Sequence, residues 1–158
     1  MIRSDTIVAS ATAPGRGAIS IIRLSGPKST EIAKALSGKS LKPRIATFGS
    51  ITSNDGIIDT GIWIYFVAPH SFTGEDTVEF QGHGGPVVIQ TILKLMTALG
   101  ARLAAPGEFS QRAFLNGKID YGSMAITSHA KTNSTFQFQM MALKDLTHTT
   151  GGNMPTTI

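Results

Sequence analysis

Two short runs of β-branched and apolar residues open the chain, at residues 6–9 and 18–24. Runs of this length and composition favour strands. Between them lies Ala-Pro-Gly-Arg-Gly at residues 13–17, a composition typical of a turn. The pattern therefore predicts two strands joined through a glycine-rich turn.

A helix is predicted to follow, from Gly26-Pro27 to a stop at Gly38. Proline suits the first helical position because it lacks an N–H that would be unpaired there, and glycine commonly ends a helix. Ile32, Ala35 and Leu36 fall on one face at helical spacing. We expect this face to be the packed one.

Residues 45–67 are predicted to form a β-hairpin, because Asn54-Asp55-Gly56 separates two apolar runs and Asp-Gly is a strong hairpin signal. Residues 62–67 are almost continuously apolar, which predicts a strand buried on both faces near the centre of a sheet. A loop over residues 69–75 and a strand over residues 77–80 are expected next.

The glycine-rich stretch at residues 82–86 then leads into a helix that we expect to reach Leu99 and to end at Gly100. Its apolar face comprises Val88, Ile89, Ile92, Leu93, Leu95, Met96 and Leu99. Residues 102–104 predict a short strand, and residues 106–117 a turn followed by a short helix. Alternating strands and helices with an antiparallel hairpin predict an α/β (α+β) fold, a mixed β-sheet with flanking helices.

The pattern changes after residue 120. Residues 130–146 are compatible with an amphipathic helix that places Phe136, Met140 and Leu143 on one side. Such a stripe needs a surface to cover it, from a second copy of the chain or another domain. The polar, Gly/Thr-rich residues 147–158 are expected to fray.

Composition narrows the function classes. The 158 residues are 41% hydrophobic and 15% charged, which suits one packed domain with an appended segment. The sequence contains no cysteine, which excludes disulfides, thiolate metal sites and thiol nucleophiles. It shows no signal peptide and no span-length apolar run, so we expect a soluble, cytoplasmic protein with no membrane association. The net charge of +4 is scattered, unlike the dense basic surface of dedicated nucleic-acid binders.

Two nucleotide-binding patterns are matched only in part. Gly38-Lys39-Ser40 imitates the end of a P-loop, but the required earlier glycine is Ala33, inside a predicted helix. Gly82 and Gly84 imitate a dinucleotide fingerprint whose third glycine would be Val87. We therefore interpret Gly38 as a helix stop and expect no nucleotide site at either position.

Catalytic and metal-binding patterns are also missing. No serine lies in a nucleophile elbow, so we assign no catalytic residue. The four histidines show no metal-ligand spacing, so we assign no metal site. They are His70, His83, His129 and His148.

Six stretches, taken in order, resemble the N-terminal domain of the MnmE/TrmE tRNA modification GTPases. Each glycine-rich stretch alone has the composition of a tight turn or cap, but all six in order make chance similarity implausible. They are residues 5–9 (DTIVA), 14–17 (PGRG), 23–26 (RLSG), 71–76 (SFTGED), 82–86 (GHGGP) and 106–120 (PGEF…RAFLNGKID). The match covers about three quarters of the chain.

This resemblance implies a fold akin to folate-binding aminomethyltransferase domains, with residues 1–119 as a tetrahydrofolate-binding domain that dimerises and residues 120–158 as the divergent start of a helical domain. The implied cofactor is 5-formyl- or 5,10-methylene-tetrahydrofolate, near the dimer interface. The implied folate contacts are Arg23, Glu79 and Lys118.

The resemblance also implies partners and limits. Family members use the folate as one-carbon donor when an aminomethyl-type group, leading to carboxymethylaminomethyl modification, is installed on the tRNA wobble uridine. They act with an FAD-dependent MnmG/GidA-type partner. GTP, magnesium and potassium belong to a G domain that these residues do not contain, so we expect no GTP hydrolysis or tRNA modification by this chain alone.

The implied contacts suit the ligand chemically. A carboxylate such as Glu79 can accept two hydrogen bonds from the amide and amino edge of a pterin. Arg23 and Lys118 suit the folate glutamate carboxylates or the formyl oxygen, and the assignment between them stays open. Trp63 and Phe80 are expected in the core, and His83 as a helix-terminus or network residue.

Residues 121–129 depart from the family pattern, since they replace a regular helix and include an apparent small deletion. This departure leaves an alternative, a dimerisation or interaction module that keeps the fold but has lost folate binding. A third reading, an autonomous aminomethyltransferase-like enzyme, lacks a candidate nucleophile or general base.

Overall fold

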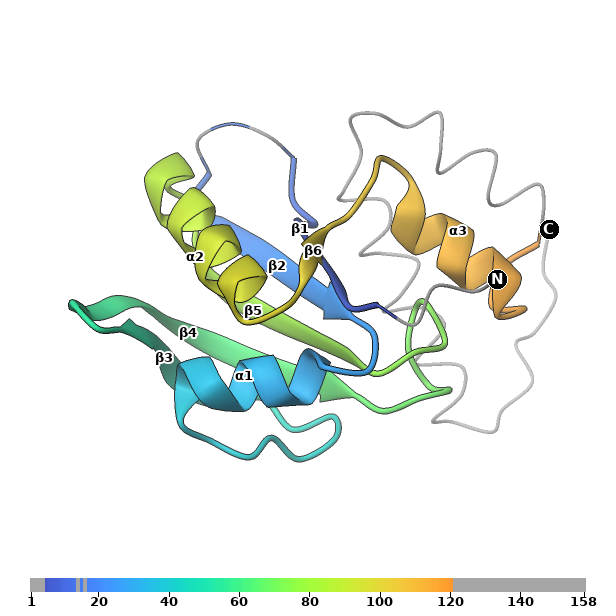
Figure 1. The fold of residues 1–158 in the computed structure, drawn as a ribbon, viewed down its shortest axis with the longest axis horizontal. Helices are drawn as coiled ribbons and strands as arrows, with labels where there is room; N and C mark the ends of the chain where they lie inside the picture. The colour runs from blue at the N-terminus through green and yellow to red at the C-terminus, as the bar shows by residue number, and fades with distance from the viewer. Residues whose placement is uncertain (1–4, 14, 16, 121–158) are drawn as a thin grey trace, which may run out of the picture.

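The computed structural model describes residues 5–13, 15 and 17–120 (Figure 1). The helix predicted over residues 130–146, the polar tail and Arg16 lie outside the described residues. No helix within the described ranges is long and apolar enough to cross a membrane.

These residues form a six-stranded sheet in the order β3-β4-β5-β2-β1-β6. Only the β1–β6 pair is parallel and the other pairs are antiparallel, so the predicted mixed α/β sheet is confirmed. The strands are β1 (Ile7–Ser10), β2 (Ile19–Ser25), β3 (Thr47–Ser53), β4 (Gly56–Phe66), β5 (Thr77–His83) and β6 (Arg102–Leu103). The helices are α1 (Ser29–Ser37), α2 (Pro86–Ala98) and α3 (Glu108–Leu115).

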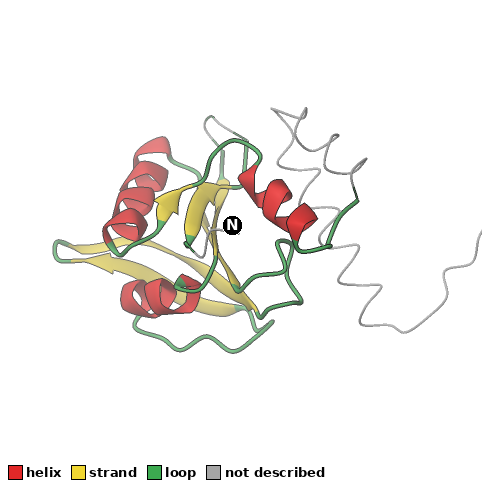
Figure 2. Cartoon of the chain, turned by 45° about the vertical axis from the view of Figure 1, so that its right-hand side comes forward, coloured by secondary structure: helices red, strands yellow, loops and turns green. Residues whose placement is uncertain are grey.

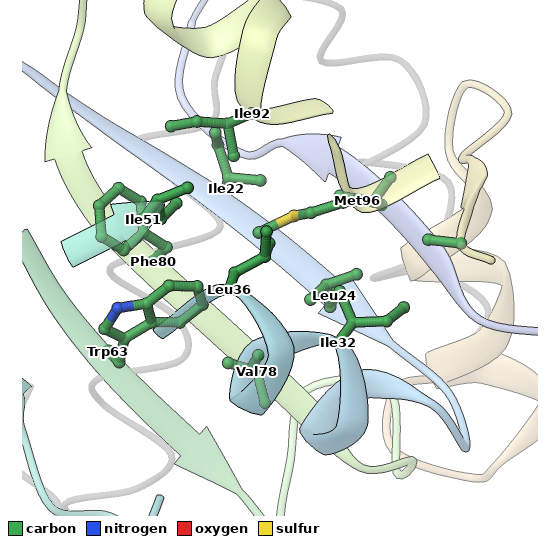
Figure 3. Close-up of a cluster of buried hydrophobic side chains, with 13 residues drawn as sticks. Ile22, Leu24, Ile32, Leu36, Ile51, Trp63, Val78, Phe80, Ile92 and Met96 are labelled. Atoms are coloured by element: carbon green, nitrogen blue, oxygen red, sulfur yellow. The ribbon is translucent and has the colours of Figure 1, made fainter. Parts of the chain in front are cut away.

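The hydrophobic core lies between one face of the sheet and the helices α1 and α2 (Figure 3). Trp63 of β4 and Phe80 of β5 stand directly opposite each other in the register, and their ring centroids are 4.8 Å apart. Trp63 is 0% and Phe80 1% exposed, which confirms their expected role in the core. Ile32 and Leu36 of α1 and Met96 of α2 join the same cluster.

The opposite face of the sheet carries the side chains that alternate with the core positions. On β2, Ile22 and Leu24 belong to the core cluster, whereas Arg23 lies between them in the strand and therefore points to the other face. Glu79 of β5 is paired with Arg23 in the register and shares that face. Figure 1 and Figure 2 show α3 well separated from α1 and α2.

Helix α1 differs from its prediction in two details. It begins at Ser29, so Pro27 precedes the helix instead of occupying its first position. Ala33 is buried where we expected Ala35, because the face turned toward the sheet comprises Ser29, Ile32, Ala33 and Leu36 at the spacing i, i+3, i+4 and i+7. Gly38 adopts φ 68° at the C-cap, which confirms the helix stop.

The β-hairpin is confirmed, with β3 ending at Ser53 and β4 beginning at Gly56, but the predicted burial of β4 on both faces is wrong. Ile62 is 39% exposed and its cross-strand partner Phe48 is 68% exposed. Helices α1 and α2 cover only the Trp63 side of this strand, so its other side keeps apolar residues at the surface. We call Phe48, Ile62 and the half-buried Ile64 the apolar patch.

The glycine-rich motif at residues 82–86 begins inside a strand, not after it. Ser20 pairs with Gly82 and Ile19 with His83, so β5 runs three residues further than predicted. A Cβ on Gly82 would overlap the Asp59 carboxylate and the Phe80 ring. The glycine thus lets β5 continue beneath Asp59 before Pro86 starts α2.

Candidate ligand-binding site

A buried ion pair joins the centres of two neighbouring strands. Arg23 on β2 and Glu79 on β5 stand directly opposite each other, and Arg23 Nε donates to Glu79 Oε1 at 2.7 Å. Their side chains are 2% and 1% exposed. Charged groups buried this deeply are costly unless they are paired, and here each charge is the partner of the other.

Two aromatic rings lie beside the guanidinium of this pair. The Arg23 Cζ atom is 5.4 Å from the centroid of Phe72 and 5.7 Å from that of Phe109. Phe72 belongs to the β4–β5 loop (residues 67–76), and Phe109 to the first turn of α3. Both distances are within the range of cation–π attraction. Both rings are half-buried.

Lys118 contacts the same loop from beyond the end of α3. Its Nζ donates to the carbonyl oxygen of Pro69 at 2.8 Å, and its aliphatic chain lies close beside Gly74. The structure therefore brings Arg23 and Glu79 into direct contact. Lys118 is connected to them through the β4–β5 loop.

A carboxylate–guanidinium network, which the sequence analysis missed, fastens α3. It comprises Asp5, Glu75, Arg102, Glu108 and Arg112. Arg102 donates to Asp5 Oδ2 at 2.7 Å and to Glu108 Oε1 at 2.6 Å. Arg112 donates to Asp5 Oδ1 at 2.7 Å and to Glu75 Oε1 at 3.1 Å. Only the Glu108–Arg112 pair, at i and i+4, was visible in the sequence.

These contacts shift the acidity of the network carboxylates. The hydrogen bond from Arg102, opposed by burial, lowers the pKa of Glu108 to about 2, with further help from the Ala105 N–H and from Arg112. The pKa of Asp5 is also lowered, first by its hydrogen bond from Arg102. Burial disfavours the charged form of Arg112, yet Glu108 and the other carboxylates raise its pKa above the ordinary value.

The lowered pKa of Glu108 predicts a loss of stability in acid. Because the folded-state pKa of about 2 lies below the model-compound value of 4.5, ionised Glu108 stabilises the fold fully only above that value. The contribution, on the order of 2–3 kcal/mol, should disappear as the pH falls toward 2. Urea denaturation at a series of pH values measures this fall. Glu108→Gln and Arg102→Met should each flatten it, and an unchanged slope in both variants would contradict the assignment.

His83 and Asp59 form a second polar pair, at the far end of β5 from Glu79. The Asp59 carboxylate accepts from the backbone N–H of His83 at 2.9 Å and lies 2.6 Å from the ring nitrogen Nδ1. Asp59 is 5% exposed, whereas the imidazole is 71% exposed. His83 is thus a network residue, as expected.

The Arg23–Glu79 site has the chemistry of a binding site for a planar polar molecule. A buried carboxylate offers two acceptor oxygens, an arginine supplies positive charge, and two aromatic faces lie beside them. The described residues contain no group of three or more side chains suited to hold a metal ion.

Comparisons with known proteins agree with the resemblance. The family described as "GTP-binding protein TrmE N-terminus" matches residues 6–118. The tRNA modification GTPase MnmE of Legionella pneumophila (strain Paris) is 52% identical over 144 residues, which cover 90% of this chain and 32% of that protein. That of Vibrio parahaemolyticus is 56% identical over 119 residues, 74% of this chain and 26% of that protein.

A third relative, the tRNA modification GTPase MnmE of Pseudomonas fluorescens (strain Pf0-1), is 49% identical over 143 residues. The chain spans between about a quarter and a third of the length of these three relatives. The matched region, residues 6–118, contains Arg23, Glu79 and Lys118 together with both aromatic residues beside Arg23. On this match and these identities, the chain belongs to the family of TrmE N-terminal domains.

Proposed function

We propose that residues 1–119 are the reduced-folate-binding and dimerising domain of a tRNA-modifying GTPase. The observation that carries this proposal is the buried Arg23–Glu79 pair between Phe72 and Phe109. Membership of the TrmE family and the names of the relatives support it. Residues 120–158 are proposed as the start of a helical domain.

The chemistry of the site fits a pterin. The amino group and ring N–H of a pterin form a donor pair that matches the two oxygens of a carboxylate, here Glu79. The faces of Phe72 and Phe109 are suited to the flat ring. Lys118, at the outer side of the same loop, is placed for the negatively charged glutamate tail. Because Glu79 is 1% exposed, a ligand reaches it only when the half-buried rings move aside.

When bound, 5-formyl- or 5,10-methylene-tetrahydrofolate supplies a one-carbon unit for the wobble uridine of tRNA. This chain's own residues bind the pterin, orient it and exclude water from it. The FAD-dependent MnmG/GidA-type partner and the tRNA are proposed partners of the longer protein, and the cytoplasm is the proposed location.

Dimerisation is proposed through the sheet face that carries the site. Ile64 of the apolar patch is directly opposite Glu79 in the β4–β5 register, so the patch and the ion pair share one face. Neighbouring apolar side chains that remain exposed mark a surface for association. A folate bound at Glu79 would then lie close to the dimer interface.

The test is an isothermal titration of the purified chain with 5-formyl-tetrahydrofolate. We expect binding, and about five-fold weaker binding by Lys118→Ala, because an exposed charge contact contributes about 1 kcal/mol. Added salt should reduce the difference between Lys118→Ala and the parent chain. Lys94→Ala, on the exposed side of α2, is the matched control. Equal weakening in both variants would show that Lys118 does not contact the ligand. No binding by a folded parent chain would refute the proposal.

One observation favours a second candidate, a dimerisation or interaction module without a ligand. Arg23 and Glu79 already neutralise each other and are closed off from solvent. A chain that dimerises but shows no heat of binding with reduced folates would be this module.

A further inference from the structure

The two aromatic rings of the candidate site come from segments outside the sheet. Phe72 lies in the β4–β5 loop and Phe109 in α3, and 36 residues separate them in sequence. Neither ring can hold its place beside Arg23 unless its segment is fixed. The positions of both rings therefore depend on the contacts that join the β4–β5 loop to α3.

Arg112 provides the main connection. Its guanidinium donates to both carboxylate oxygens of Glu75, at 3.1 and 3.2 Å, and so links α3 to the β4–β5 loop. It also donates to the backbone oxygen of Asp5 at 2.8 Å and to the Asp5 carboxylate at 2.7 Å. These bonds link α3 to the segment that leads into β1. The Arg112 side chain is 7% exposed, which limits competition from water.

Each aromatic residue lies three residues before a member of the Arg112–Glu75 link. Phe109 precedes Arg112 by three residues on α3, which places both side chains on neighbouring positions of one helix face. Phe72 precedes Glu75 by three residues in the loop. A second, weaker link lies one turn further along the helix, where Asn116 Nδ2 donates to the Thr73 carbonyl at 2.7 Å.

The connection between the β4–β5 loop and α3 depends on the positive charge of Arg112. Asp5, Glu75 and Glu108 bring three carboxylates around Arg112, and Arg102 is the other guanidinium of the network. Without Arg112, like charges on the loop and on α3 would repel each other across a partly desolvated space. The loop and the helix would then move apart, and the rings with them.

We propose that Arg112 is a positioning residue of the folate site, which sets the separation of Phe72 and Phe109 by clamping the β4–β5 loop to α3. This inference rests on the proposed function. The hydrogen bonds of Arg112 go to Asp5, Glu75 and Glu108, not to Arg23 or Glu79, so its effect on the ligand is indirect.

The test compares Arg112→Met, which keeps the apolar stem, with Arg112→Lys, which keeps the charge. We expect Arg112→Met to weaken 5-formyl-tetrahydrofolate binding about ten-fold, mainly by faster dissociation, and Arg112→Lys to recover part of the loss. Leu36→Ala, in the core on the opposite face of the sheet, is the control for general destabilisation. It should leave the affinity unchanged at temperatures where it is folded.

A double-variant comparison separates positioning from structure. If Arg112 acts through the ring of Phe109, Arg112→Met should weaken binding less than two-fold in a Phe109→Ala background. Full, additive weakening there would overturn the inference. So would wild-type affinity in a folded Arg112→Met variant.

Hydrogen exchange of the ligand-free chain keeps the inference testable if the folate proposal itself fails. We expect faster exchange in residues 69–76 and in α3 of Arg112→Met, with α1 unchanged. If the parent chain binds no folate but Arg112→Met shows this pattern, the proposed ligand is refuted and the clamp is retained. Unchanged exchange in both segments would refute the clamp.

Discussion

The double variant Arg23→Met/Glu79→Leu is expected to be nearly as stable as the parent chain and yet to bind no reduced folate. Either single change leaves a buried charge without its counter-ion and should lower the free energy of unfolding by about 3–5 kcal/mol. Replacing both charges by apolar groups of similar size removes that cost. Urea denaturation and folate titration of the three variants measure the two effects separately.

This design distinguishes a ligand site from a structural ion pair. Loss of binding by Glu79→Ala alone would be ambiguous, because the change also destabilises β5 next to the core residue Phe80. The double variant is informative because its fold is preserved. Folate affinity equal to that of the parent chain would show that the pair is structural only and that the ligand binds elsewhere or not at all.

A charge in the apolar patch is expected to dissociate the proposed dimer. Phe48→Asp should raise the dimer dissociation constant at least about 100-fold, because two-fold symmetry places each substitution in the interface twice. Sedimentation equilibrium over a range of concentrations measures the constant. Phe48 is 68% exposed and makes little contact with its own chain, so the variant should fold normally.

Val87→Asp is the matched control for this prediction. Val87 is 80% exposed, but it lies at the start of α2, on the core side of the sheet. We expect this variant to dimerise as the parent chain does. Equal dissociation of both variants, or a parent chain that is monomeric, would contradict dimerisation through the patch.

Local chemistry accounts for the parts of the fold that the sequence predicted. The Asp55-Gly56 turn, the stop at Gly38 and the start of α2 at Pro86 each depend on the conformational preference of one or two residues. The burial of β4 was mispredicted because a run of apolar residues does not distinguish a strand covered on both faces from one that keeps apolar side chains exposed on its second face. Only the arrangement of α1 and α2 separates the two cases.

For the candidate site, the sequence predicted some of the residues but not the contacts between distant segments. Arg23, Glu79 and Lys118 were expected from the family resemblance, and the structure brings the first two into contact. The partners of Arg112 were beyond sequence reasoning, since Glu75 and Asp5 lie 37 and 107 residues away from it. Phe72 and Phe109 occur in the motifs, but their position beside Arg23 depends on how the loop and α3 fold back over the sheet.

The central claim is that the Arg23–Glu79 site binds a reduced folate, and a crystal structure of the chain with 5-formyl-tetrahydrofolate tests it most directly. We predict the amino edge of the pterin within hydrogen-bonding distance of the Glu79 carboxylate, with Phe72 or Phe109 displaced to admit it. A pterin bound elsewhere, with Arg23 and Glu79 still enclosed by both rings, would contradict the claim.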